Sequence, residues 1–230
     1  MLPVAILAGG LATRLRPLTE TIPKALLEIN REPFLAHQLR LLRRNGIERV
    51  VLCAGYRGEQ IFQYAGDGRA FGLHIDYSFD GPHLLGTAGA IRRALPLLGE
   101  RFFVLYGDSY LPCDYAAVER AFLVSHQLGL MTVFRNDGHW DTSNLEYSEG
   151  RILLYDKVNR TPAMRYIDYG LGAFCRPAFE TLPQDHPADL AALYQDLLRT
   201  GELAGLEVPT RFYEIGSPEG IRELSEFLAP

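Results

Sequence analysis

The chain has 230 residues, of which 47% are hydrophobic and 22% charged, and it carries a formal net charge of −5. This length suits one domain with a substantial core, and the composition is that of a globular protein and not of a disordered or membrane-spanning chain. The acidic balance argues against a general nucleic-acid binder, because such proteins carry a basic face, but it does not exclude a nucleotide ligand.

The cysteine pattern and the absence of long apolar runs indicate in which cellular compartment the protein is expected. Cys53, Cys113 and Cys175 are far apart and form no C-x-x-C pair. An odd number of widely spaced thiols indicates reduced side chains. No charged-then-apolar leader precedes the first apolar run, and no run approaches the length of a membrane span. We therefore expect a cytoplasmic protein with no membrane partner.

The N-terminal segment combines a strand pattern with glycines and cations. Residues 4–7 form a short apolar run that predicts a buried strand. Gly9 and Gly10 follow, and because they lack Cβ their N–H groups can approach an anion closely. Arg14 offers a planar fork of donors that matches phosphate oxygens, and Lys24 offers a mobile point charge. The segment predicts a polyphosphate site, although two glycines after a strand also occur in ordinary turns.

The next elements alternate between strands and helices. Residues 33–45 show apolar positions at helical spacing, and residues 47–56 form a second buried run. Residues 58–64 predict a short helix and residues 73–79 a third strand. This alternation predicts a mostly parallel central sheet covered on both faces, in a Rossmann-like three-layer α/β sandwich. Ligands bind at the carboxyl ends of strands in such sheets, and the glycine-rich turn lies at such an end.

A second informative loop runs from Asp80 into a helix predicted over residues 86–98. Gly86 and Thr87 begin this helix, and small residues there leave N–H groups free for an anion or a flat ring. An ordinary N-cap by Thr87 is the simpler alternative. Asp80 offers a carboxylate that could accept from the N–H groups of guanine.

Acidic residues follow two further predicted strands. Residues 101–110 form a central strand that ends at Gly107 and Asp108. Asp108 fits either a turn former or an oxygen ligand for Mg²⁺, which takes one or two protein carboxylates and keeps much of its water. Glu214 lies at the end of a short strand predicted over residues 212–215.

The second half of the chain continues the α/β pattern. Its predicted elements are a helix over residues 113–127, a strand over 130–135, a hairpin over 144–157, a strand over 166–174, a helix over 188–201, and a closing helix capped by Ser217 and begun by Pro218. The polar stretch 136–143 contains the only tryptophan. His139 and Asp141 have no further partner at ligand spacing, so this stretch is interpreted as a mobile loop near the substrate entrance.

Two charged positions in this half are informative. The hairpin leads to Asp156 and Lys157, which form either a substrate contact or an exposed surface ion pair. Asp168 and Gly170 lie within an apolar strand, where a carboxylate must be hydrogen-bonded or reach solvent in a cleft. Asp168 therefore has either a binding or a structural role.

Two strings carry a family resemblance. Residues 9–19 (GGLATRLRPLT), followed by Pro23 and Lys24, resemble the signature G-G-x-G-T-R-L-x-P-L-T then P-K of the sugar-1-phosphate nucleotidylyltransferases. Ala12 is the one departure, since the family usually has Gly there. Residues 85–90 (LGTAGA) match a second family segment. The resemblance covers nearly the whole chain and is greatest to short members such as heptose-1-phosphate guanylyltransferases and muramate-1-phosphate uridylyltransferases.

The resemblance implies a fold of the nucleotide-diphospho-sugar transferase type. It implies one domain over residues 1–230, with a nucleotide-binding part over 1–112 and a sugar-phosphate-binding part over 113–230. The implied reaction is Mg²⁺-dependent transfer from an NTP to a sugar 1-phosphate, with a preference for guanylyl transfer to a heptose or related sugar. Alternatives are uridylyl, thymidylyl or cytidylyl transfer to another phosphorylated metabolite, or a non-catalytic regulatory relative. A homo-oligomer is left open, and the glycine spacing excludes a dinucleotide-dependent oxidoreductase.

The resemblance also implies roles for individual residues. The catalytic residues would be Arg14, Lys24, Asp108 and Lys157. The nucleotide would contact Leu7, Ala8, Gly9, Gly10, Thr13, Arg14, Asp80, Gly86 and Thr87. The sugar phosphate would contact Gly107, Asn144, Asp156, Lys157, Asp168 and Gly170, and Mg²⁺ would be held by Asp108 and Glu214. Two departures weaken the match: Val158 replaces a proline, and Glu214 stands where the family usually has Asp.

Overall fold

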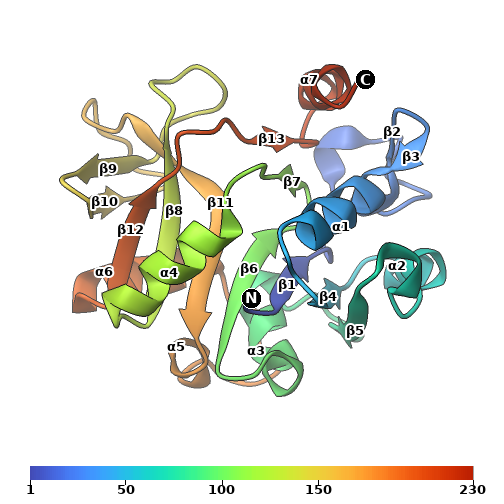
Figure 1. Ribbon diagram of the computed structural model, residues 1–230, viewed down its shortest axis with the longest axis horizontal. Coiled ribbons are helices and arrows are strands. Elements are labelled where there is room, and N and C mark those ends of the chain that lie inside the picture. The colour runs from blue at the N-terminus through green and yellow to red at the C-terminus, as the bar shows by residue number, and fades with distance from the viewer. Residues whose placement is uncertain (230) are drawn as a thin grey trace.

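A nine-stranded sheet forms the centre of the computed structural model, which describes residues 1–229 (Figure 1). Four neighbouring strands are parallel and come from the first half of the chain. In spatial order they are β6 (Arg101–Tyr106), β1 (Val4–Leu7), β4 (Arg49–Ala54) and β5 (His74–Phe79). The sequence predicted a strand at each of these four positions, and the predicted fold class is confirmed.

The second half of the sheet is mixed in direction. β11 (Tyr166–Cys175) is antiparallel to β6 and also to β8 (Gly129–Arg135), which is parallel to β12 (Leu203–Glu207). The predicted hairpin is present as β9 (Leu145–Ser148) and β10 (Arg151–Tyr155), and it forms one edge of the sheet. β12 was not predicted.

β11 contains an irregularity close to the carboxyl edge of β6. The register between β11 and β8 shifts between Asp168 and Gly172, and Gly170 has a φ of +101°. A bulge of this kind redirects the side chains around it. It places Asp168 toward a cavity while Leu171 and Ala173 remain in the core.

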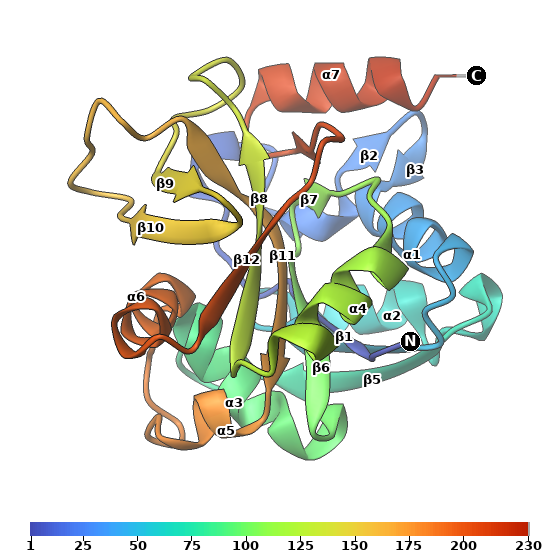
Figure 2. The same ribbon diagram turned by 60° about the vertical axis from the view of Figure 1, so that its left-hand side comes forward.

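Helices cover both faces of the sheet, as Figures 1 and 2 show. The helices on one face are α1 (Phe34–Arg44), α2 (Gly58–Ala65) and α4 (Tyr115–Ser125); those on the other are α3 (Gly86–Leu98), α5 (Pro177–Glu180) and α6 (Leu190–Thr200). β1 alternates between the two cores, with Val4 and Ile6 in one and Ala5 in the other. None of the helices within residues 1–229 combines the length and apolar character needed to cross a bilayer.

Short strands join the end of the chain to the sheet. β7 (Ser109–Tyr110) pairs with β13 (Tyr213–Glu214), and β2 (Glu28–Ile29) pairs with β3 (Glu32–Pro33). α7 (Pro218–Phe227) follows β13, and the Ser217 hydroxyl accepts a hydrogen bond from the Gly220 N–H, which confirms the predicted cap. The β7–β13 pairing brings Glu214 beside Asp108, whose carbonyl accepts from the Ile215 N–H at 2.9 Å.

The first turn of α3 differs in part from the expectation of free N–H groups. The N–H groups of Ala88 and Gly89 both donate to the Ala188 carbonyl, at 2.9 and 3.3 Å. They are therefore not available to an anion or a ring, because a chain segment 100 residues later satisfies them. A Cβ on Gly89 would lie 2.6 Å from the His186 carbonyl oxygen, so the glycine permits this close approach.

Thr87 also has a different role from the N-cap considered as the simpler alternative. Its hydroxyl donates to Asp189 at 3.0 Å and accepts from the Leu190 N–H at 2.7 Å. No side chain caps α3 itself. Thr87 thus stabilises the beginning of α6 and fixes that helix against α3.

We expect Gly89→Ala to lower the free energy of unfolding by about 1–3 kcal/mol, the usual cost of overpacking. The added methyl group would push residues 186–188 away from α3. For a domain of this size each kcal/mol corresponds to about 2–4 °C in the thermal midpoint, which calorimetry measures. Gly10→Ala is the matched control, because no atom lies within 4 Å of its added Cβ. Equal midpoints for the two variants would contradict this account of α3.

Candidate active site

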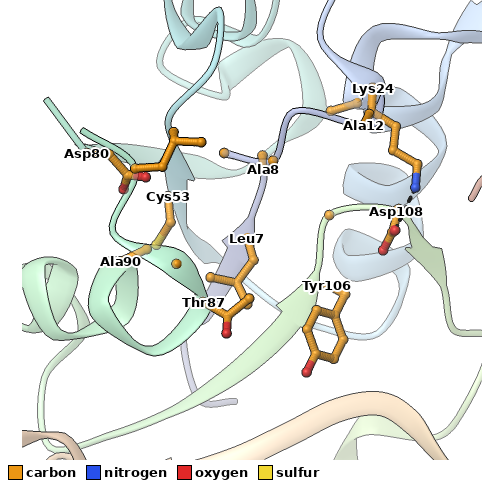
Figure 3. Close-up of a pocket in the computed structure, with 16 residues that line it drawn as sticks. Leu7, Ala8, Ala12, Lys24, Cys53, Asp80, Thr87, Ala90, Tyr106 and Asp108 are labelled. Carbon is orange, nitrogen blue, oxygen red and sulfur yellow. Dashed lines mark hydrogen bonds and ion pairs between the residues drawn. The ribbon is translucent and has the colours of Figure 1, made fainter. Parts of the chain in front are cut away.

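Two adjoining cavities open at the carboxyl ends of the parallel strands, and both include Tyr106 and Asp108. We call the first the β1 cavity; it has a volume of about 290 Å³ and is mainly apolar. The predicted residues that line it are Leu7, Ala8, Gly9, Gly10, Lys24, Asp80, Gly86, Thr87, Gly107 and Asp108. In Figure 3, Asp80 lies to one side of Ala8 and the Lys24–Asp108 pair to the other.

The second, which we call the β11 cavity, has a volume of about 550 Å³ and is more polar. The predicted residues that line it are Arg14, Asp108, Asn144, Lys157, Asp168, Gly170 and Glu214. Thr13 and Asp156 line neither cavity. Cations and carboxylates far apart in the sequence are thus brought to one place.

An ion pair stands where the two cavities meet. Lys24 Nζ lies 2.7 Å from Asp108 Oδ2, and both side chains are partly buried (Figure 3). Lys24 belongs to a 3₁₀ turn at the end of the glycine-rich loop, whereas Asp108 follows β6. Gln38 of α1 fixes the corner around Asp108, since its Nε2 donates to the carbonyls of Tyr106 and Ser109 at 3.1 and 2.8 Å. Sequence reasoning did not identify Gln38, because a lone glutamine on a helix carries no local signal.

The loop after β1 is held by the connection between β4 and α2. The Tyr56 hydroxyl and Arg57 Nη2 donate to the Glu20 carbonyl at 3.0 and 2.6 Å. Gln60 Nε2 donates to the Thr21 carbonyl at 3.1 Å. These contacts fix the course of the loop before it reaches Lys24.

Ala12, the departure from the family signature, has a left-handed backbone with a φ of +48°. An L-residue costs roughly 1–2 kcal/mol in this conformation, which explains why a glycine suits the position. The Thr19 hydroxyl donates to the Ala12 carbonyl at 2.9 Å and supports the turn.

Glu214 is an acid of the β11 cavity with a raised pKa. Burial raises its pKa to about 7, and the negative charges of Asp108 and Asp141 add to the shift, while Lys24 and Arg14 oppose it. Two carboxylates that repel each other in a partly buried site form a donor set for a divalent cation, which would relieve that repulsion. Within residues 1–229 no group of three or more His, Cys, Asp or Glu side chains gathers, but Mg²⁺ needs only one or two protein carboxylates. The residues present therefore fit Mg²⁺.

Lys157 and Asp168 also line the β11 cavity. Lys157 Nζ lies 5.4 Å from the centroid of the Tyr106 ring and 6.0 Å from that of Tyr155, so the cation faces two aromatic rings. Asp168 Oδ1 accepts from the Gly170 N–H at 3.0 Å, while its buried Oδ2 has no partner among the described residues. Burial raises the pKa of Asp168, and the Lys157 charge opposes that rise. An unpaired buried acceptor beside a cavity is suited to a ligand hydroxyl.

Asp156 is used within its own turn. Its Oδ1 accepts from the N–H groups of Val158 and Asn159 at 2.7 and 2.9 Å, and its Oδ2 accepts from the Asn159 amide at 3.1 Å. These bonds lower the pKa of Asp156. The structure therefore does not bring this carboxylate to either cavity, and a role in substrate binding stays a prediction.

Several residues of the β11 cavity were not identified from the sequence. They are Tyr106, Ser109, Thr142, Arg160, Ile167, Tyr169 and Phe212, and Asp141 had been considered only as an isolated metal ligand. Tyr106 directly precedes Gly107-Asp108, so its place at the strand end was the one available signal.

Comparisons with known proteins identify the family of the chain. A model of the nucleotidyl transferase family matches residues 4–143. The N-acetylmuramate alpha-1-phosphate uridylyltransferase of Neisseria meningitidis serogroup B is 30% identical over 224 residues, which cover 95% of this chain and 94% of that protein. The D-glycero-alpha-D-manno-heptose 1-phosphate guanylyltransferase of Campylobacter jejuni is 28% identical over 215 residues, covering 93% and 94%. The solved structure of HddC from Yersinia pseudotuberculosis complexed with GMP-PN shares the fold, with a TM-score of 0.84 at 24% identity over 100% of both chains.

The fold is an α/β fold of the nucleotide-diphospho-sugar transferase type. The chain belongs to the nucleotidyl transferase family, and its resemblance to the sugar-1-phosphate nucleotidylyltransferases is confirmed.

The raised pKa of Glu214 predicts a pH-dependent stability. The folded protein binds this proton more tightly than the unfolded chain, whose glutamate has the ordinary pKa of 4.5, so the stabilisation is complete below about 4.5 and is lost as the pH rises through about 7. We expect Glu214→Gln, which stays neutral, to raise the thermal midpoint above that of the wild type at pH 8 but much less at pH 5. The measurement is thermal unfolding in buffer with a metal chelator.

Glu59→Gln on the exposed face of α2 is the control for this prediction, since it should shift the midpoint equally at both pH values. A Glu214→Gln midpoint that follows the wild type at both pH values would show that Glu214 is not destabilised by its surroundings.

Proposed function

We propose that the protein transfers a nucleotidyl group from an NTP to a sugar 1-phosphate in a Mg²⁺-dependent reaction that yields an NDP-sugar and pyrophosphate. The observation that carries this proposal is the junction of the two cavities at Asp108. A nucleotide in the β1 cavity and a sugar phosphate in the β11 cavity would meet there with their phosphates facing each other. The family membership and the names of the relatives support the same reaction.

The two cavities also support the proposed division of the chain. The β1 cavity is lined only by residues up to Asp108, whereas most of the β11 cavity comes from residues 141–214. A nucleotide-binding part over 1–112 and a sugar-phosphate-binding part over 113–230 fit this arrangement. The NTP substrate and the three free cysteines favour the cytoplasm as the place of the reaction.

The proposed chemistry needs charge neutralisation more than proton transfer. The nucleophile is a phosphate oxygen that is already anionic near neutral pH, so no general base is required. Arg14 and Lys24 would stabilise the triphosphate, and Lys157 would hold the incoming phosphate. Asp108 and Glu214 would hold Mg²⁺, which when bound offsets phosphate charge and polarises the phosphoryl oxygens. The fixed positions of these side chains align the reactants.

Asp80 supports a preference for guanine. Its carboxylate is buried in the β1 cavity, and Oδ2 accepts from the Leu85 N–H at 3.2 Å. Arg93 Nη1 holds the same segment through the carbonyls of Phe79 and Asp80, at 2.9 and 2.8 Å. A carboxylate can accept from the two adjacent N–H groups of guanine, whereas uracil offers one N–H between two carbonyls. The proposed acceptor is a heptose or related sugar 1-phosphate, as the name of the Campylobacter jejuni relative suggests, whereas the Neisseria meningitidis relative is named for N-acetylmuramate and uridylyl transfer.

We expect Asp108→Asn to keep the fold and to reduce kcat about a hundredfold to a thousandfold, the loss typical of one preorganised electrostatic group. Pyrophosphate release with a panel of NTPs and sugar 1-phosphates measures this rate. Asp196→Asn on the exposed face of α6 is the control and should keep full activity. A wild-type protein that releases no pyrophosphate with any pair would favour a non-catalytic, ligand-binding role.

Asp80→Asn should shift the base preference. Loss of a hydrogen bond to a charged group costs about 1.5–3 kcal/mol, so the kcat/KM for GTP relative to UTP should fall about tenfold to a hundredfold. Asp185→Asn, which removes an exposed partner of Arg93 outside the cavity, should leave the ratio unchanged. An unaltered ratio for Asp80→Asn would remove this residue from base recognition.

A further inference from the structure

Arg211 connects the loop that contains Trp140 with β13 and α7 near the end of the chain. Its guanidinium carbon lies 3.4 Å from the centroid of the Trp140 ring and 4.7 Å from the centroid of the Tyr213 ring. Its Nη2 also donates to Glu223 of α7. Tyr213 stacks on Phe227 of α7, with ring centroids 4.3 Å apart and an interplanar angle of 24°. The loop after β8 and α7 lie at the same end of the sheet, the top of Figures 1 and 2.

The loop that contains Trp140 is stiffened from within by Asn136. The Asn136 amide donates to the Asp141 carbonyl and to Ser143 Oγ, the latter at 3.2 Å, and Asn136 Oδ1 accepts from the Trp140 N–H at 3.2 Å. Asp141 and Thr142 of the same loop line the β11 cavity. The loop therefore forms one wall of that cavity, and the Trp140 ring is its contact with Arg211.

The chain segment that follows Arg211 also reaches the β11 cavity. Phe212 and Glu214 follow it directly in the chain, and both line the β11 cavity. Arg211 thus lies between two walls of one site without lining the site itself. None of these segments lines the β1 cavity.

The environment of Arg211 needs an explanation other than stability. Its Nε is buried and has no hydrogen-bond partner among the described residues, which is a cost that a purely structural residue would avoid. The planar guanidinium stacks on an aromatic ring, a geometry that lysine cannot reproduce.

We infer that Arg211 is a positioning residue for the sugar-phosphate half of the site: by stacking on Trp140 it holds the Asp141–Thr142 wall against the β11 cavity. This inference rests on the proposed function, since it assigns the β11 cavity to the sugar phosphate. It predicts that Arg211 and Trp140 set the affinity for the sugar phosphate and leave the affinity for the NTP nearly unchanged. Because Trp140 is the only tryptophan of the chain, its fluorescence can report on the stack with Arg211.

The test compares Arg211→Lys, Trp140→Ala and the conservative Trp140→Phe. The first two should raise the KM for the sugar 1-phosphate about threefold to thirtyfold, the range that corresponds to loss of the stack. The KM for the NTP should change less than twofold, and Trp140→Phe should recover most of the wild-type value. Arg222→Lys, on the same helix as Glu223 but paired only with Glu219, is the matched control and should change neither KM.

A second readout follows the stack directly. Trp140 fluorescence should shift in Arg211→Lys, and in the wild type it should respond to a sugar 1-phosphate added without NTP. An unchanged sugar-phosphate KM in both Arg211→Lys and Trp140→Ala, or an equal rise of both KM values with a lowered thermal midpoint, would overturn the inference. A wild type without turnover refutes the proposed function and this inference together, whereas normal turnover with an unchanged sugar-phosphate KM refutes only the positioning role.

Discussion

The site depends on the parallel pairing of β1 with β6. This pairing sets Leu7 opposite Tyr106, and the Gly107 N–H donates to the Leu7 carbonyl at 3.1 Å. The glycine-rich turn and Asp108 therefore leave the sheet at the same level, and Lys24 can reach Asp108 across the gap. Opposite charges held apart from bulk water interact more strongly than exposed ones. The fold thus provides, before any ligand arrives, a place where anions can be brought together.

Much of the fold could be predicted because its central strands are buried on both faces. The runs at β1, β4 and β6 are mostly apolar without alternation, as expected for parallel strands between two layers of helices, whereas β5 at the edge of the sheet is only partly buried. β12 was missed because its sequence, LAGLE, lacks β-branched residues and is a strand only through its pairing with β8. β2 and β3, each two residues long, were likewise missed, whereas β13 lies within the strand predicted over residues 212–215.

In the candidate site, too, residues in short contiguous patterns could be predicted, whereas contacts between distant positions could not. The glycine-rich turn, Lys24 and Asp108 could be found because each forms part of a short contiguous pattern. The hydrogen bonds of the Ala88 and Gly89 N–H groups could not be predicted, because their acceptor, the Ala188 carbonyl, lies about 100 residues further along the chain. The contact between Trp140 and Arg211 joins positions about 70 residues apart and depends on the whole sheet being assembled.

The irregular register of β11 restricts which sequence changes this site can accept. The strand carries Asp168 into the β11 cavity and, a few residues later, Leu171 and Ala173 into the core. Side chains alternate along a strand, so inserting or deleting one residue here would exchange the cavity-facing and core-facing sets. Among related chains, the side chains that β11 presents to the cavity should therefore change by substitution. Insertions and deletions should be confined to the loops that precede and follow this strand.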